Sequence, residues 1–140
     1  MVYIGIRFKT QPQYPVMQTI NSPSAPAAVG AYSHAVRVGG LLFCSGQIPL
    51  DPTTKALVPG GIREQTRQVL RNIAAVLDAE DLSLHHVVKS TVFLADMNDF
   101  AVVNGLYAEA FGDHKPARSA VQVAALPLGA LIEIEVIAEG

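Results

Sequence analysis

The stretch IREQTRQVLRNIAAVLDAE, residues 62–80, carries the clearest secondary-structure signal of the chain and decides the fold class. Its apolar side chains recur every three or four residues with the charged ones opposite, as in a helix that packs on one face. A second helix is predicted over 100–112, ending at Gly112. Each helix requires a second layer to pack against. The apolar stripe of the first helix consists of Ile62, Thr66, Val69, Leu70, Ile73, Val76 and Leu77.

Strand patterns on both sides of these helices supply the second layer. The segments 33–38 and 41–46 flank a glycine pair and predict a β-hairpin. The β-branched segment 87–95 predicts a central strand. The order β-β-α-β-α-β-β predicts an α+β fold, a two-layer sandwich of a mixed β-sheet with two helices on one face. The remaining strands are predicted at 117–123, at 130–138 and, as a short extra strand, at 18–20.

The chain of 140 residues has the length of one domain, which we assign to 17–140. Residues 1–16 have no signal-peptide pattern, and a sequence typical of a natural start follows at Met17. We therefore expect 1–16 to be a non-native or disordered extension translated upstream of the true start. An intact residue 1 in the natively expressed protein, measured by mass spectrometry, would contradict this expectation.

Composition narrows the classes of function. The net charge of −2 gives no electrostatic footprint for nucleic acid or an anionic membrane, and no apolar run is long enough to span a bilayer. The single cysteine, Cys44, excludes an internal disulfide and a cysteine-built zinc site, and the cytoplasm is the expected compartment. The four histidines show no metal-ligand spacing, whereas Tyr107 and Phe111 have the spacing of core packing.

Alternation along the last two strands predicts which side chains face away from the helices. In the strand at 130–138, Glu133 alternates with isoleucines that suit the helix side. In the strand at 117–123, Arg118 alternates with valines. Arg118 and Glu133 are therefore expected to share the face that the helices leave open.

Arg118 and Glu133 leave two interpretations open. One is a structural ion pair across adjacent strands. The other is a binding site, because the planar fork of an arginine suits a small carboxylate, and a nearby glutamate could orient or deprotonate a water. The residues alone therefore predict an α+β domain with a candidate carboxylate site.

Several motifs together resemble the reactive intermediate deaminase (Rid) family, in particular its deaminase A branch of 2-iminobutanoate/2-iminopropanoate deaminases. The resemblance covers residues 18–138 in order, and the blocks SGQIP and PARS are its most specific motifs. The segments that carry it are APAAVGAYSHAVRVGGLLFCSGQIPLDP (25–52), EQTRQVLRNIAAVL (64–77), VVKSTVFLADMNDFAVVNGLYAEAFG (87–112), KPARSAVQVAALP (115–127) and IEIEVIA (132–138).

The resemblance implies a fold, an assembly and a reaction. The fold would be chorismate-mutase-like, and three copies would form a homotrimer in which the helix-free sheet faces meet and ligand clefts lie between neighbouring subunits. The reaction would be the hydrolytic deamination of reactive 2-imino acids and their enamine tautomers to 2-keto acids and ammonia. No cofactor, metal, nucleic acid or membrane is implied.

The resemblance also implies site residues. Arg118 matches the arginine that clamps the substrate carboxylate, and Glu133 matches the glutamate that positions the attacking water. Many relatives carry a cysteine where this chain has Ala120, so we expect the reaction to proceed without a thiol. The positions that match substrate-binding residues are Tyr32, Ser45, Gly46, Asn104, Arg118 and the main chain at Ala120.

Two competing functions are weighed against the deaminase. A ribonuclease or translation inhibitor, an activity attributed to some relatives, fits poorly with the acidic balance of the chain. A non-catalytic trimer that binds small carboxylates or acts like a chaperone is less favoured by the retained cleft residues, since a chaperone would have no use for Arg118.

Overall fold

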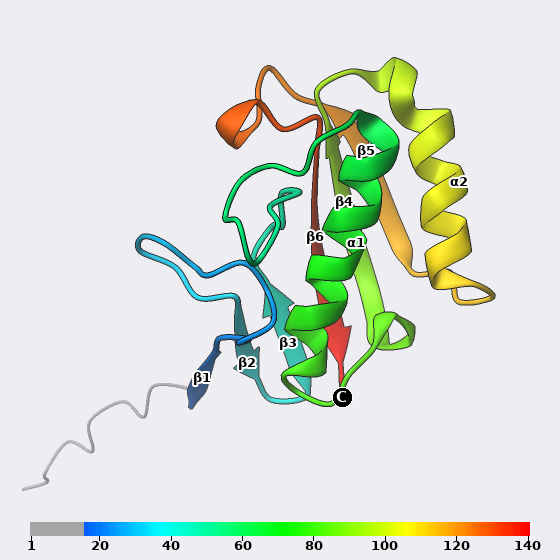
Figure 1. The fold of residues 1–140 in the computed structure, drawn as a ribbon. Coiled ribbons are helices and arrows are strands. Elements are labelled where there is room, and N and C mark those ends of the chain that lie inside the picture. The colour runs from blue at the N-terminus through cyan, green and yellow to red at the C-terminus, as the bar shows by residue number, and fades with distance from the viewer. Residues whose placement is uncertain (1–15) are drawn as a thin grey trace, which may run out of the picture.

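The protein is described by a computed structural model over residues 16–140. The extension expected at 1–16 lies outside the described residues except for Val16. A single six-stranded sheet runs through the domain in the order β1-β2-β3-β6-β4-β5 (Figure 1). Its strands are β1 (Met17–Ile20), β2 (Ala35–Val38), β3 (Leu41–Cys44), β4 (Val87–Leu94), β5 (Ala117–Gln122) and β6 (Ile132–Glu139).

The two predicted helices, α1 (Ile62–Asp78) and α2 (Phe100–Phe111), lie side by side over one face of this sheet (Figure 1). All strand pairs are antiparallel except β4 with β5, which makes the sheet mixed. The predicted α+β class with two layers is therefore confirmed. Short 3-10 turns occur at Leu84–His86, Met97–Asp99 and Pro127–Gly129.

The core lies between the helices and the sheet. The apolar stripe of α1 contributes Val69, Ile73 and Leu77, and the facing side chains of β6 include Ile132 and Ile134. All five side chains are almost fully buried. The packing of the helices on the sheet is stabilised because it removes the apolar surface of these side chains from water. The hairpin of β2 and β3 turns at Gly39, whose positive φ of 57° suits a glycine turn.

Sheet order overturns one interpretation of Arg118 and Glu133. β4 lies between β5 and β6, so the two residues are not on adjacent strands. The proposed structural ion pair across adjacent strands is wrong for that reason. Among residues 16–140, the one ion pair joins Arg37 and Glu80, with 3.3 Å between Nη2 and Oε2.

Register also corrects the prediction that Arg118 and Glu133 share the open face. Val92 of β4 pairs with Ala120 on one side and Ile134 on the other, and paired residues point to the same face. Arg118, two positions before Ala120, therefore points toward the helices, and Glu133, next to Ile134, points away from them. The alternation was predicted correctly along each strand, but the faces of β5 were exchanged.

Candidate functional site

One copy of the chain divides the predicted site residues between two cavities on different faces of the sheet. Arg118 and Asn104 line a cavity of about 470 Å³ beside α2, which we call the arginine cavity. Tyr32, Ser45 and Glu133 line a cavity of about 500 Å³ on the other face, the glutamate cavity, together with Gly46. Ala120 lies on the side of Arg118 and packs against the core.

The guanidinium of Arg118 is held in place by α2. Its Nη1 donates a hydrogen bond of 2.8 Å to Oδ1 of Asn104. Its Cζ lies 4.9 Å from the ring centroid of Tyr107 and 5.4 Å from that of Phe100. The three α2 residues follow one another at intervals of four and three positions, which places them on one stripe of the helix. The result is an exposed, oriented cation with donors left for an anion.

Tyr107 is itself fixed from behind. Its hydroxyl lies 2.9 Å from Oγ of Ser90, and both side chains are buried. Its ring stacks on Phe111 at a centroid distance of 4.3 Å, which confirms the predicted packing of these two residues. Burial raises the pKa of the Tyr107 hydroxyl, so it remains a neutral phenol. The contact of this ring with Arg118 is a second role that the sequence indicates only through the spacing of Phe100, Asn104 and Tyr107 on a common helix face.

Tyr107→Phe is expected to lower the free energy of unfolding by about 1–2 kcal/mol, because the buried Ser90 hydroxyl then loses its partner. The aromatic face under Arg118 remains, so substrate binding is expected to weaken only a few-fold. Thermal unfolding and kcat/KM measure the two effects. The control is the double variant Ser90→Ala/Tyr107→Phe, in which no buried hydroxyl is left over. If the double variant is no more stable than Tyr107→Phe, the hydrogen bond does not carry the effect.

The carboxylate of Glu133 lies directly against Gly46. A Cβ added at Gly46 would overlap the carboxylate of Glu133, so only glycine leaves room for this side chain. The pKa of Glu133 is raised, first by burial and then by the negative charge of Glu135. A partly buried carboxylate with a raised pKa beside a cavity is suited to act as a general base.

Gly46→Ala is expected to displace the carboxylate of Glu133 and to lower kcat/KM about 100-fold, the lower end of the usual contribution of a positioned acid–base group. Stability should change by less than about 1 kcal/mol, because the displaced atoms are the free end of a flexible side chain. Gly40→Ala is the matched control, since a Cβ there meets nothing. Equal activity of the two variants would contradict the role assigned to this contact.

Ser45 lines the glutamate cavity, and His34 supports from behind the loop that contributes Pro26 to its lining. The hydroxyl of Ser45 donates to the carbonyl of Ser33 at 2.7 Å, so it is committed to the main chain rather than free to act as a nucleophile. The buried ring of His34 accepts a hydrogen bond from the Ser22 amide at Nδ1, 2.9 Å away, and its Nε2 lies 2.7 Å from the Pro26 carbonyl. This pattern requires the neutral ring with its proton on Nε2. No pattern in the sequence indicates this role of His34.

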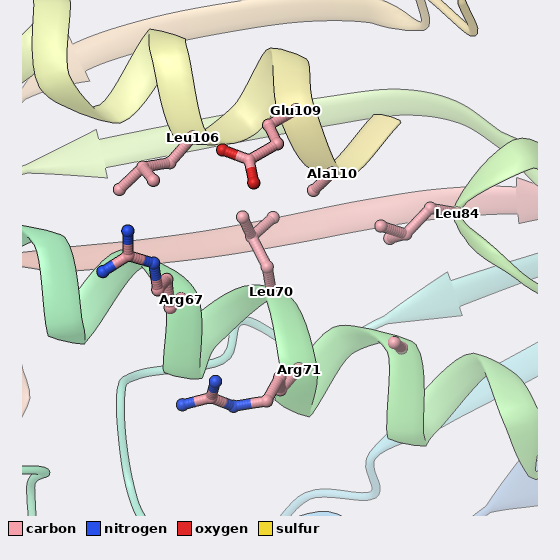
Figure 2. A pocket seen from close by; sticks show the side chains of 8 residues that line it. Arg67, Leu70, Arg71, Leu84, Leu106, Glu109 and Ala110 are labelled. Carbon is pink, nitrogen blue, oxygen red and sulfur yellow. The ribbon is translucent and has the colours of Figure 1, made fainter. Parts of the chain in front are cut away.

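A further groove, of about 370 Å³, lies between α1 and α2 and contains none of the predicted site residues. Arg67 and Leu70 of α1 face Leu106 and Glu109 of α2 across it (Figure 2). Cys44 is partly buried, and burial raises the pKa of its thiol to about 12, which disfavours the reactive thiolate. Within residues 16–140, no group of three or more potential ligands could hold a metal, and no helix could cross a membrane.

Comparison with known proteins identifies the family. The model of the endoribonuclease L-PSP family matches residues 22–140. A RutC family protein of Pyrococcus horikoshii is 54% identical over 121 residues, which cover 86% of this chain and 96% of the relative. The 2-iminobutanoate/2-iminopropanoate deaminase of Mus musculus is 49% identical over 123 residues, which cover 88% and 91%.

Solved structures agree with this assignment. RidA from the Antarctic bacterium Psychrobacter sp. PAMC 21119 is 48% identical with a TM-score of 0.84, and the match covers 88% of this chain and 99% of that one. TdcF of E. coli, solved with bound serine, is 41% identical with a TM-score of 0.83, covering 88% and 98%. The predicted resemblance to the Rid family is therefore confirmed, and the chain belongs to the endoribonuclease L-PSP family.

Proposed function

We propose that this protein hydrolyses 2-imino acids and their enamine tautomers, such as 2-iminobutanoate and 2-iminopropanoate, to 2-keto acids and ammonia. The observation that carries the proposal is the oriented guanidinium of Arg118, which α2 holds without any carboxylate in ion-pair contact among residues 16–140. Such a cation fits the carboxylate that all 2-imino acids share. Relatives at 49–50% identity that carry the name 2-iminobutanoate/2-iminopropanoate deaminase support the reaction.

In the proposed mechanism, Arg118 binds the substrate carboxylate and thereby fixes the position of the C=N carbon. Glu133 accepts a proton from a water whose oxygen attacks that carbon, which gives a tetrahedral carbinolamine. Glu133 passes this proton to the nitrogen, which becomes an amino group. Glu133 then takes the proton of the carbinolamine hydroxyl and delivers it to the nitrogen as the C–N bond breaks, so ammonia leaves and the hydroxyl oxygen becomes the keto oxygen. Tyr32, Gly46, Asn104 and the main chain at Ala120 would line the site, and the reaction needs no metal or organic cofactor.

We further propose a homotrimer in which the arginine cavity of one copy meets the glutamate cavity of the next. One copy holds Arg118 and Glu133 on opposite faces of the sheet, so it cannot apply both to one small substrate. The open face of the sheet also exposes large apolar side chains, which favours burial against another copy. These side chains include Leu41, Phe43 and Val121. The assembly would act in the cytoplasm.

Glu135→Gln is expected to shift the acid limb of the pH profile of kcat/KM to lower pH. The negative charge of Glu135 helps to raise the pKa of Glu133, so removing it lowers that pKa. Glu133 then keeps its basic, ionised form to a lower pH. Rates measured between about pH 4 and pH 8 report the shift. Glu139→Gln, at the far end of the same strand, is the control; a limb that does not move in Glu135→Gln would show that Glu133 is not the base.

Cleavage of RNA is the competing function, because the family carries the description endoribonuclease. Arg63, Arg67 and Arg71 follow one another every four residues of α1 and form one basic row. This row lies on the helical layer, away from Glu133. RNA binding that weakens steeply with salt and is lost on changing these arginines to glutamine would favour that function.

The deciding experiment generates 2-iminobutanoate in situ with threonine dehydratase and follows the disappearance of this imine over time. The wild-type protein should accelerate the loss, and Glu133→Gln should not. Absence of acceleration by the wild type would overturn the deaminase proposal.

A further inference from the structure

Three exposed apolar side chains gather around the mouth of the glutamate cavity. Val29 is 77% exposed, Tyr32 is 51% exposed and Leu128 is 72% exposed, and all three line the cavity that holds Glu133. Single exposed apolar residues are ordinary on a protein surface, but a cluster at one cavity marks a place where apolar material binds. We call these three residues the apolar rim.

Leu128 adds a second, independent observation. Its backbone has φ 58° and ψ 17°, the left-handed region that costs a leucine on the order of 1 kcal/mol. A glycine would adopt this conformation more easily, yet a large apolar side chain occupies position 128 with most of its surface exposed. Packing contacts within the described residues do not explain why a leucine occupies this strained position. Strain of this kind is characteristic of binding sites.

Two polar groups of this wall are committed to the protein. The Ser45 hydroxyl donates to the Ser33 carbonyl at 2.7 Å, and the main-chain amide of Gln47 donates to the Ile134 carbonyl at 2.9 Å. The nearest ionised group that the cavity offers is Glu133, which the mechanism assigns to the water. The rim therefore presents apolar surface without a charge to select a polar side chain.

We propose that the apolar rim is the subsite for the substrate side chain, and that it makes the protein prefer 2-imino acids with larger or branched aliphatic side chains. This inference rests on the proposed function, because the carboxylate clamp and the Glu133 water fix C2 and leave the side chain pointing toward the rim. Each additional buried CH2 group should raise affinity roughly fourfold. Two extra carbons should therefore raise it by about fivefold to fifteenfold.

The test compares binding of two stable keto acids by calorimetry: 2-oxobutanoate and 2-oxo-4-methylpentanoate, which has two further carbons. The wild type should bind the branched acid about fivefold to fifteenfold more tightly. In Leu128→Lys this ratio should fall close to one. Val16→Lys, which places the same charge at an exposed apolar residue outside the cavity, should leave the ratio unchanged.

The same samples are assayed for hydrolysis of the two corresponding imines and sized by light scattering. Selective binding without hydrolysis would refute the proposed reaction and leave the subsite standing. Hydrolysis with equal affinity for both keto acids, or binding of neither acid, would overturn the subsite. A change of assembly size in Leu128→Lys would also overturn it, because the rim would then be a contact between copies.

Discussion

Arg118→Ala is expected to lower kcat/KM for 2-iminobutanoate from about thirtyfold to several thousandfold, which corresponds to a loss of about 2–5 kcal/mol. The guanidinium is the group proposed to bind the substrate carboxylate, and a fork of two charge-assisted hydrogen bonds is among the stronger polar contacts in proteins. The fold should tolerate the change. Arg118 is exposed, and its contacts with Asn104, Phe100 and Tyr107 lie at the edge of the helical layer.

Arg118→Lys distinguishes the effect of the positive charge at this position from the effect of the planar guanidinium geometry. Lysine retains the positive charge but cannot form the planar fork or stack in the same way between the rings of Phe100 and Tyr107. We expect partial activity, with KM raised more than kcat is lowered, because the lost contacts bind the unreacted carboxylate as well as the transition state. If Arg118→Ala hydrolyses the imine as fast as the wild type, the clamp is wrong.

The fold was predictable from the sequence because its strongest signals are local. The periodicity of α1 and the β-branched run of β4 each specify an element without reference to the rest of the chain. The position of β4 between β5 and β6 is a property of the whole sheet, and no local pattern contains it. The prediction of a structural ion pair was wrong because it assumed that the strands of Arg118 and Glu133 are neighbours.

The exchanged faces of β5 have a related cause. Alternation divides a strand into two sets of side chains but does not say which set meets the helices. The valines looked like the buried set, yet Val121 is exposed on the open face and Arg118 lies under α2. An edge strand permits this, because the rings of Phe100 and Tyr107 receive the guanidinium while its donors reach solvent.

The chemistry of the site was easier to predict than its construction. Arg118 and Glu133 stand out as charged residues in apolar strands. The support of Arg118 by Tyr107 and the bracing of the Tyr32 loop by His34 depend on contacts between distant segments. The spacing along α2 indicates the contact between Tyr107 and Arg118 only weakly. No spacing in the sequence indicates the contacts of His34.

Mixing two inactive variants is expected to restore activity if the site spans two copies. The proposed trimers are assembled from equal amounts of Arg118→Ala and Glu133→Gln chains carrying different tags. Each proposed site takes Arg118 from one copy and Glu133 from its neighbour, so random assembly leaves about one site in four intact. The mixture should therefore reach about a quarter of wild-type activity, although each variant alone is nearly inactive.

The control mixes Glu133→Gln with Gly46→Ala, whose defects both lie in the glutamate cavity. No arrangement of these copies supplies an intact glutamate cavity, so this mixture should stay as weak as its parents. Purification by both tags in turn confirms that mixed trimers formed. Recovery in the first mixture alone would mean that neighbouring copies share each site. No recovery in verified mixed trimers would mean that a single copy must bring Arg118 and Glu133 together, which the opposite faces of its sheet do not allow without rearrangement.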